Sequence, residues 1–191
     1  MVRMFSIKLT EGEQQTCLQV ARDSILHGLQ NGSALDIEIM EYPKNLTQHL
    51  ASFVTLYLQG QLRGCIGALV ASQPLIKDIA EHAYAAAFKD PRFPALTNNE
   101  FNKITIDISV LAKPEPIIFK NKQDLLRQIR PGVDGLIIEH GYNRGTFLPS
   151  VWEQLPTVNE FFQHLKIKAG LPENWWKDDV KVSRYETFSI S

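Results

Sequence analysis

Apolar side chains recur at helical spacing near the start of the chain, between about residues 11 and 30. One face of this stretch carries Cys17, Leu18, Ala21, Ile25 and Leu29. Thr10 and Glu13 have the spacing of a capping box, and Asn31-Gly32 is typical of a helix end. The pattern predicts a first helix, and we interpret Cys17 as a small residue of its buried face.

Strand patterns occupy the middle of the chain. Residues 52–58 and 62–70 are rich in β-branched, aromatic and other apolar types, and Gln59-Gly60-Gln61 separates them, which is typical of a β-hairpin. Farther on, apolar and polar positions alternate strictly, with Ile104, Ile106, Ile108 and Val110 on one face. This alternation predicts a half-buried strand, which Pro114-Glu115-Pro116 should interrupt.

A second helix is predicted between these strands, over about residues 73–89. Ser72 and Pro74 favour its start, and Asp90-Pro91 favours its end. Its apolar face is rich in alanine and consists of Ile76, Ile79, Ala80, Ala83 and Ala87. Because alanine is small, we expect another element to pack closely against this face.

The remaining patterns predict further helices and hairpins. They comprise a short turn capped by Thr97 and Glu100, a helix at about 122–130, a hairpin of 135–140 with 146–148 around 141–144, a helix at about 158–169 capped by Thr157 and Glu160, and a last strand at 180–189. Helices thus mix with hairpins along the chain. This order predicts an α+β fold rather than a doubly wound parallel sheet.

Composition and charge narrow the classes of function. The chain has 191 residues, 44% of them apolar, which fits one domain or two small lobes with a real core. Its 20 basic and 21 acidic residues give a net charge of −1, so we expect no general attraction to nucleic acid or to a membrane. No apolar run reaches the ~20 residues that span a bilayer. Arg3 and Lys8 interrupt the apolar residues at the start, unlike a signal peptide, and we therefore expect a cytoplasmic protein.

The two cysteines, Cys17 and Cys65, lie far apart in dissimilar contexts. In a reducing cytosol we expect both to be reduced and unbonded, with their Cα atoms beyond the ~7 Å limit for a disulfide. The sequence contains no Cys-x-x-Cys pair, no His-x-x-x-His pair and no nucleotide-binding glycine motif. We therefore predict no metal site and no cofactor.

The segment Leu62-Arg63-Gly64-Cys65-Ile66-Gly67 is the most unusual in the chain. Two glycines weaken a strand, so we expect Gly64 or Gly67 to have a positive φ or to face a backbone too close for a Cβ atom. In a regular strand Arg63 and Cys65 would share a face, whereas a bulge at Gly64 would separate them. A ligand-facing thiol beside a cation and a tightly packed hairpin with an inert cysteine both fit these residues.

A second segment, Asp90-Pro91-Arg92-Phe93-Pro94-Ala95-Leu96, is stiffened by two prolines. A stiff loop can present Asp90 and Arg92 to a ligand, but the two side chains could also pair simply with each other. We expect this loop and the Arg63–Cys65 segment to face one concave surface between two lobes. Cys65 Sγ should then lie within roughly 12 Å of a side-chain atom of Asp90 or Arg92.

Thr146 and His82 are two further candidates for the site. Thr146 offers a hydroxyl within Gly145–Trp152, a stretch that otherwise fits scaffold. His82 lies on the helix after the hairpin and could pair with Cys65 as a base, although a solvated histidine on the helix surface is the favoured interpretation.

Taken in order along the chain, these motifs resemble one family, the AMMECR one-type domain, also called AmmeMemoRadiSam system protein A. The resemblance rests on Leu62–Gly67, Asp90–Leu96, Ile108-Ser109-Val110-Leu111 with Pro114-Glu115-Pro116, Gly132-Val133-Asp134-Gly135, Thr146-Phe147-Leu148-Pro149 and Lys168-Ala169-Gly170-Leu171-Pro172. It implies one α+β domain over residues 1–191, with a larger lobe built from both chain ends, a smaller lobe from the middle, and the Arg-Gly-Cys segment facing a cleft between them. His82 departs from the family pattern, in which we expect asparagine.

The resemblance leads to two hypotheses for function and leaves open whether the protein is an enzyme. In the first, a small molecule, whether anionic or not, binds in the cleft, with Cys65 as nucleophile and with Asp90 and Glu115 as acid–base groups. The ligand-binding residues would be Arg63, Gly64, Gly67, Arg92, Phe93 and Thr146. In the second, the protein is a non-catalytic module that acts with a Memo-type, dioxygenase-like protein and a radical S-adenosylmethionine protein, the two partners that the family name records.

Overall fold

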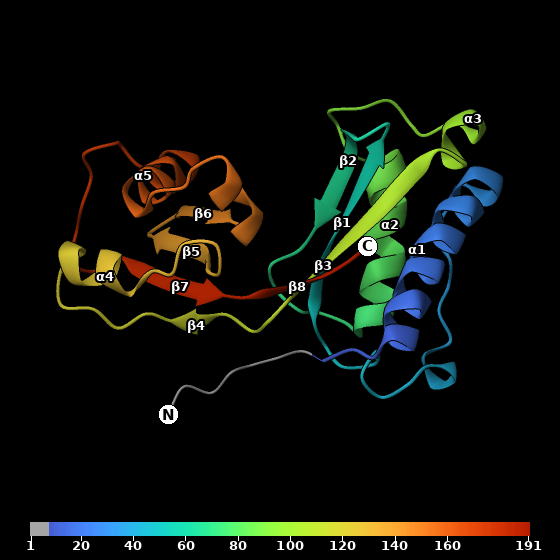
Figure 1. The fold of residues 1–191 in the computed structure, drawn as a ribbon, viewed down its shortest axis with the longest axis horizontal. Coiled ribbons are helices and arrows are strands. Elements are labelled where there is room, and N and C mark those ends of the chain that lie inside the picture. The colour runs from blue at the N-terminus through green and yellow to red at the C-terminus, as the bar shows by residue number, and fades with distance from the viewer. Residues whose placement is uncertain (1–7) are drawn as a thin grey trace. The chain divides into compact units, whose positions relative to one another are not determined.

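Residues 8–191 are described by a computed structural model, in which the chain divides into two units. The first unit extends to Ala112 and includes Phe188–Ser191, and the second is Lys113–Thr187 (Figure 1). Each unit contains helices and a four-stranded sheet. The predicted α+β fold, with one lobe from both chain ends and one from the middle, is therefore confirmed. A single domain over residues 1–191 stays a prediction.

The first unit begins with a long helix, α1 (Glu11–Asn31), which has the predicted capping box at its start and Gly32 at its end with a φ of 72°. The other helical elements are the 3-10 turn η1 (Ile39–Glu41), α2 (Leu75–Phe88) and α3 (Asn98–Phe101). The strands are β1 (Ala51–Leu58), β2 (Gln61–Gly67), β3 (Ile104–Leu111) and β8 (Thr187–Ile190). They form a sheet in the order β2-β1-β3-β8, in which β2 is an edge strand.

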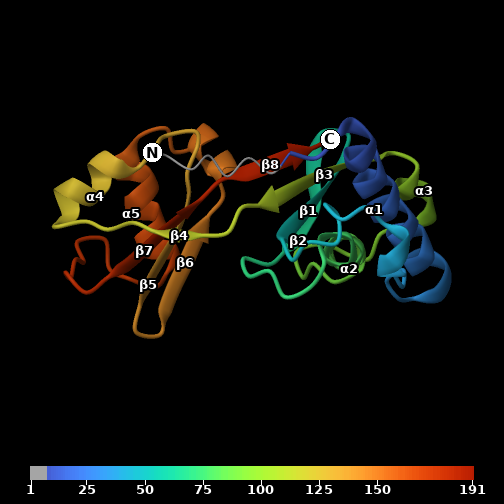
Figure 2. The same cartoon turned by 90° about the horizontal axis from the view of Figure 1, so that it is seen from below.

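The alternation of β1 and β3 gives this sheet two different faces. Alternate residues of these strands, such as Val54 and Ile108, are buried in one core with the alanine-rich face of α2. The residues between them, such as Thr55 and Asp107, point to the opposite face. Figure 2 shows α1 and α2 on the same side of β1, β2 and β3. We call the other side the helix-free face of the first unit.

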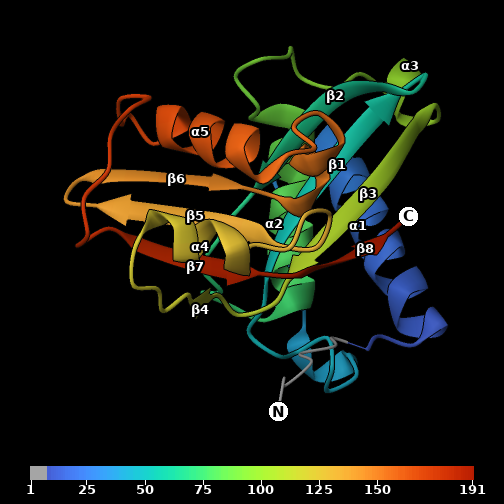
Figure 3. The same cartoon turned by 60° about the vertical axis from the view of Figure 1, so that its left-hand side comes forward.

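The second unit contains β4 (Glu115–Pro116), α4 (Lys122–Gln128), β5 (Gly135–His140), β6 (Asn143–Phe147), the 3-10 turn η2 (Pro149–Glu153), α5 (Val158–Lys168) and β7 (Lys181–Tyr185). Its strands form a second antiparallel sheet in the order β4-β7-β5-β6. Residues of both helices, including Leu125 and Phe161, pack with Leu136 and Ile138 of β5 in a separate core. Figure 3 shows α5 running alongside β6.

Several predicted boundaries are wrong. The last strand, expected as one element over 180–189, is two strands in different sheets, because β7 pairs in the second unit and β8 in the first. The turn of the second hairpin is shorter than 141–144, since Asn143 and Arg144 already pair with β5. Glu115 and Pro116, expected only as a break, also form a two-residue edge strand with β7.

Within residues 8–191, no helix combines the length and the apolar character that crossing a membrane requires.

Candidate functional site

A β-bulge organises the Arg-Gly-Cys segment. Leu56 pairs with Gly64, whereas the next residue, Tyr57, pairs with Leu62, so Arg63 is an extra residue in β2. Cys65 lies opposite Thr55 and shares its helix-free face. The bulge therefore places Arg63 and Cys65 on different faces of β2. A regular strand, the other possibility that the sequence left open, would have placed them on the same face.

Arg63 is only 7% exposed and anchors the segment that follows α2. Its Nε and Nη2 atoms donate to the two carboxylate oxygens of Glu100 at 2.8 and 3.2 Å, and Nη2 also donates to the carbonyl of Pro94 at 3.0 Å. The hydrogen bonds from Arg63 lower the pKa of Glu100 to about 2. These contacts favour a positioning role for Arg63 over direct binding of a ligand.

Both glycines of the motif are required by close packing. A Cβ atom on Gly64 would overlap the carbonyl oxygen of Ala86 in α2, and one on Gly67 would overlap the backbone of Ser52 and the ring of Phe53. Neither glycine has a positive φ. The prediction that at least one of them faces a backbone too close for a Cβ atom is therefore confirmed, and the close approach of α2 to β2 explains it.

Asp90 and Arg92 together cover the outer edge of β2 at Cys65. The carboxylate of Asp90 accepts the backbone N–H of Cys65 at 2.9 Å and binds Arg92 through both oxygens, at 3.0 and 2.7 Å. Arg92 in turn donates to the backbone carbonyl of Cys65 at 3.4 Å. The two side chains thus occupy the place of a neighbouring strand. The predicted proximity of the Cys65 segment and the Asp90 loop is confirmed.

The charged groups of Asp90 and Arg92 differ in how far they are exposed to a ligand. Asp90 is 4% exposed, and hydrogen bonds from Arg92 hold its pKa well below its usual range. A carboxylate held ionised in this way is a poor acid–base group near neutral pH, so the geometry favours a positioning role for Asp90. The side chain of Arg92 is 54% exposed. Its guanidinium can therefore meet a ligand while Asp90 keeps it beside Cys65.

The thiol of Cys65 is partly exposed on the helix-free face, and the hydroxyl of Thr55 donates to its sulfur at 3.2 Å. Such a donor stabilises negative charge on sulfur. Cys17, by contrast, is fully buried on α1, and burial raises its pKa to about 12. Both are free cysteines in the structure, and their reduced state in the cell stays a prediction.

The ring of Phe93 lies near both arginines, with its centroid 5.9 Å from Cζ of Arg63 and 5.5 Å from Cζ of Arg92. An aromatic face at this range attracts a guanidinium. Phe93 therefore supports the arrangement of the loop, whether or not it also contacts a ligand.

The two remaining predicted residues belong to the second unit. Glu115 is exposed on β4 and pairs in register with Arg184. The hydroxyl of Thr146 lies 2.9 Å from both the carbonyl of Leu136 and the hydroxyl of Tyr185. These contacts explain Thr146 as a structural residue, and a role for either residue at Cys65 stays a prediction.

His82 is not the solvated histidine that the sequence favoured. Its side chain is 15% exposed, and Nδ1 lies 3.0 Å from the buried carboxylate of Asp78. Ser52 donates to the same carboxylate through its backbone N–H and its hydroxyl, at 2.8 and 2.7 Å. His82 thus belongs to a polar cluster that ties α2 to β1, and this explains why it is mostly buried.

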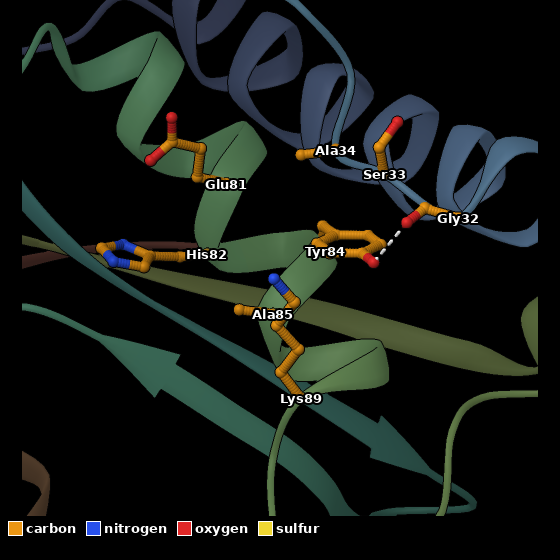
Figure 4. A pocket seen from close by; sticks show the side chains of 8 residues that line it. All are labelled: Gly32, Ser33, Ala34, Glu81, His82, Tyr84, Ala85 and Lys89. Carbon is orange, nitrogen blue, oxygen red and sulfur yellow. Dashed lines mark hydrogen bonds between the residues drawn. The ribbon is translucent and has the colours of Figure 1, made fainter.

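A hollow of about 370 Å³ lies along α2 (Figure 4). Glu81, His82 and Lys89 contribute to its wall, and the hydroxyl of Tyr84 closes one end by donating to the carbonyl of Gly32 at 2.7 Å. None of the residues predicted for the site lines this hollow. In the described part of the chain, His, Cys, Asp and Glu side chains form no group of three or more that could hold a metal ion.

Sequence reasoning missed two residues that shape the site. Glu100 was recognised only as a capping residue, although its carboxylate also binds Arg63, 37 positions earlier. Thr55 carried no signal of its own, because its contact with Cys65 depends on the register of the hairpin. The sequence allowed for a bulge at Gly64, which turns Arg63 to a different face from Cys65. That bulge alone does not indicate that Arg63 binds Glu100.

Comparisons with known proteins identify the family and the fold. A sequence model of the family described as AMMECR1 matches residues 18–190. Protein MJ0810 of Methanocaldococcus jannaschii is 41% identical over 158 residues, which cover 78% of this chain and 77% of the relative. Protein MK0488 of Methanopyrus kandleri is 36% identical, with 94% and 88% covered. The crystal structure of the uncharacterized protein PH0010 from Pyrococcus horikoshii has a TM-score of 0.85 and 31% identity, covering 95% of this chain and 92% of that one.

Proposed function

The chain belongs to the AMMECR1 family, and we propose that its function centres on Cys65, where a small anionic ligand binds beside the thiol. One observation carries the proposal: Asp90 fixes the half-exposed guanidinium of Arg92 against the backbone of Cys65. A guanidinium has a planar fork of donors that suits a carboxylate or a phosphate. Arg63 and Glu100 hold the bulge that gives Cys65 its orientation.

Thiol-dependent chemistry is the reaction class that this arrangement supports. Cys65 would be the nucleophile, and the hydroxyl of Thr55 would stabilise its sulfur as a thiolate. Of the acid–base groups predicted from the sequence, Asp90 is a weak candidate, because it is buried and held ionised. Glu115 belongs to the second unit, and its role stays a prediction. We also propose a cytoplasmic location, since two free cysteines suit a reducing compartment.

Mass spectrometry of small molecules that co-purify with the full chain tests this proposal. We expect a bound anion that is retained by Cys17→Ser, reduced by Cys65→Ser and lost in Arg92→Ala. Cys17→Ser is the matched control, because it removes the buried thiol and leaves the partly exposed one. A ligand that all three variants retain equally would contradict a site at Cys65.

The alternative is a non-catalytic module that acts with a Memo-type protein and a radical S-adenosylmethionine protein. The exposed apolar side chains of Ile118 and Tyr142, on the second unit, favour it. Size-exclusion chromatography of the purified protein with each of these partners tests it. A complex that is lost in Ile118→Ser or Tyr142→Ser and unaffected by Arg92→Ala would support this alternative over the ligand site.

A further inference from the structure

Strand register places three polar residues in one row across the helix-free face of the first unit. Thr55 of β1 pairs with Cys65 of β2 on one side and with Asp107 of β3 on the other. Side chains directly opposite each other in an antiparallel sheet lie on the same face, with Cβ atoms ~5 Å apart. The row therefore runs from a thiol through a hydroxyl to a carboxylate, and neighbouring strands ~4.8 Å apart place its ends ~10 Å from each other.

No contact within the described part of the chain explains why position 107 carries a charged side chain. Asp107 is partly exposed, and its carboxylate makes no hydrogen bond or ion pair with any other described residue between positions 8 and 191. The other acidic groups near this site differ in this respect, because Asp90 binds Arg92 and Glu100 binds Arg63. An unpaired carboxylate on a sheet face is free to bind a cation from outside the protein.

Groups of opposite charge lie at the Asp107 end of the row and just beyond its Cys65 end. Arg92 lies just beyond the outer edge of β2, where it contacts the carbonyl of Cys65, and Asp107 lies two strands inward. Because Arg92 lies beyond the Cys65 end of a row ~10 Å long, hydrogen bonds of ~3 Å to Arg92 and to Asp107 would leave at least ~4 Å between the charged groups of a bridging molecule. Such a molecule would pass over the sulfur of Cys65 and the hydroxyl of Thr55, which are 3.2 Å apart.

We propose that the ligand of the Cys65 site is a zwitterion, with its anionic group on Arg92 and an ammonium group on Asp107, separated by a chain of about the length of 5-aminopentanoate. This inference rests on the proposed function, because it keeps Arg92 as the anion-binding residue. It adds Asp107 as a specificity-determining residue. A ligand of this kind satisfies both charges, whereas a simple anion satisfies only Arg92.

Ligand-observed NMR titrations of the full chain with 5-aminopentanoate and with pentanoate test the inference. The second probe lacks only the amine. We expect wild type to bind 5-aminopentanoate about fivefold more tightly than pentanoate, the effect of one partly exposed ion pair. Asp107→Asn should abolish this preference and leave the affinity for pentanoate unchanged. Asp36→Asn, which removes an exposed charge elsewhere in the same unit, should preserve it.

The outcomes separate the inference from the proposed function. Equal affinity for the two probes in wild type, a preference retained in Asp107→Asn, or no detectable binding of 5-aminopentanoate would overturn the inference. If pentanoate binds and Arg92→Ala weakens it, the anionic site stands even when the preference for the amine is absent. If pentanoate binding is unaffected by Arg92→Ala, the proposed anionic site fails as well. Thermal unfolding of Asp107→Asn checks that the variant is folded.

Discussion

The thiol of Cys17 is enclosed in the helix layer of the first unit, whereas the thiol of Cys65 lies partly exposed on the opposite face of the same sheet. The surroundings of Cys17 are apolar, and they keep it protonated by raising its pKa to about 12. Those of Cys65 consist of a hydroxyl donor, an arginine and a backbone held by Asp90. The difference shows that the exposure and the polar contacts of each cysteine depend on which face of its element it occupies.

The largest expected effect is on thiol reactivity. We expect iodoacetamide at pH 7.5 to modify Cys65 at least ~100-fold faster than Cys17, because Cys17 reacts only after local unfolding. Time-resolved peptide mass spectrometry measures both rates in one sample. Cys65→Ser should leave only the slow reaction. Comparable rates for the two cysteines would mean that Cys65 is no more accessible or reactive than the buried Cys17.

Substitution of Gly64 tests the close packing beneath Cys65. We expect Gly64→Ala to lower the free energy of unfolding by about 2–3 kcal/mol, since the added Cβ overlaps the carbonyl of Ala86 in α2. Urea denaturation measures the change. Gly12→Ala, where the added atom meets nothing within 4 Å, should be close to neutral. A tolerated Gly64→Ala would mean that α2 can move away from β2, and that the orientation of Cys65 is not held by packing.

Acid titration tests the ion pair that holds the bulge. Glu100 has a pKa near 2 in the folded protein and 4.5 as its ordinary value, so its pairing with Arg63 stabilises the fold fully above pH 4.5. This contribution is lost as the pH falls towards 2. We expect Glu100→Gln to reduce the unfolding free energy by about 1–2 kcal/mol at pH 6, and the difference from wild type to shrink between pH 4.5 and 2.5.

The control for this titration is Glu139→Gln, because Glu139 forms an exposed pair with Arg144 at 3.2 Å. Exposed pairs contribute little, so its difference from wild type should be small at every pH. A Glu100→Gln variant whose deficit does not change with pH would show that the carboxylate charge is not what holds Arg63.

The smallest expected effect concerns Arg92. Its guanidinium favours negative charge on the nearby sulfur, so we expect Arg92→Ala to slow alkylation of Cys65 about threefold. Arg144→Ala removes a comparably exposed arginine of the second unit and should not change the rate. Faster alkylation in Arg92→Ala would mean that Arg92 acts mainly by covering the thiol of Cys65. The guanidinium would then not be what makes this thiol more reactive than that of Cys17.

Much of the site follows from the sequence because its signals are local. The spacing of Thr10 and Glu13, the alternation of β3 and the two glycines of β2 depend on neighbours in the same element, and each predicted feature is found. The strand partner of the last segment was not predictable in this way. β7 and β8 are separated only by Glu186, and nothing local indicates that they join different sheets.

By itself, the sequence determined that Cys17 lies on an apolar helix face and that the Arg-Gly-Cys segment needs its glycines. Only the tertiary structure decided that Arg63 binds Glu100, that Asp90 binds the backbone of Cys65, and that Thr55 and Asp107 share a row with the thiol. The physical reason is that periodicity and capping act over a few residues, whereas the hydrogen bonds of Thr55, Asp90 and Arg63 join residues that lie 10 to 37 positions apart. Their formation depends on how the elements pack, and the bulge at Arg63 shows that one extra residue is enough to change which side chain meets which partner.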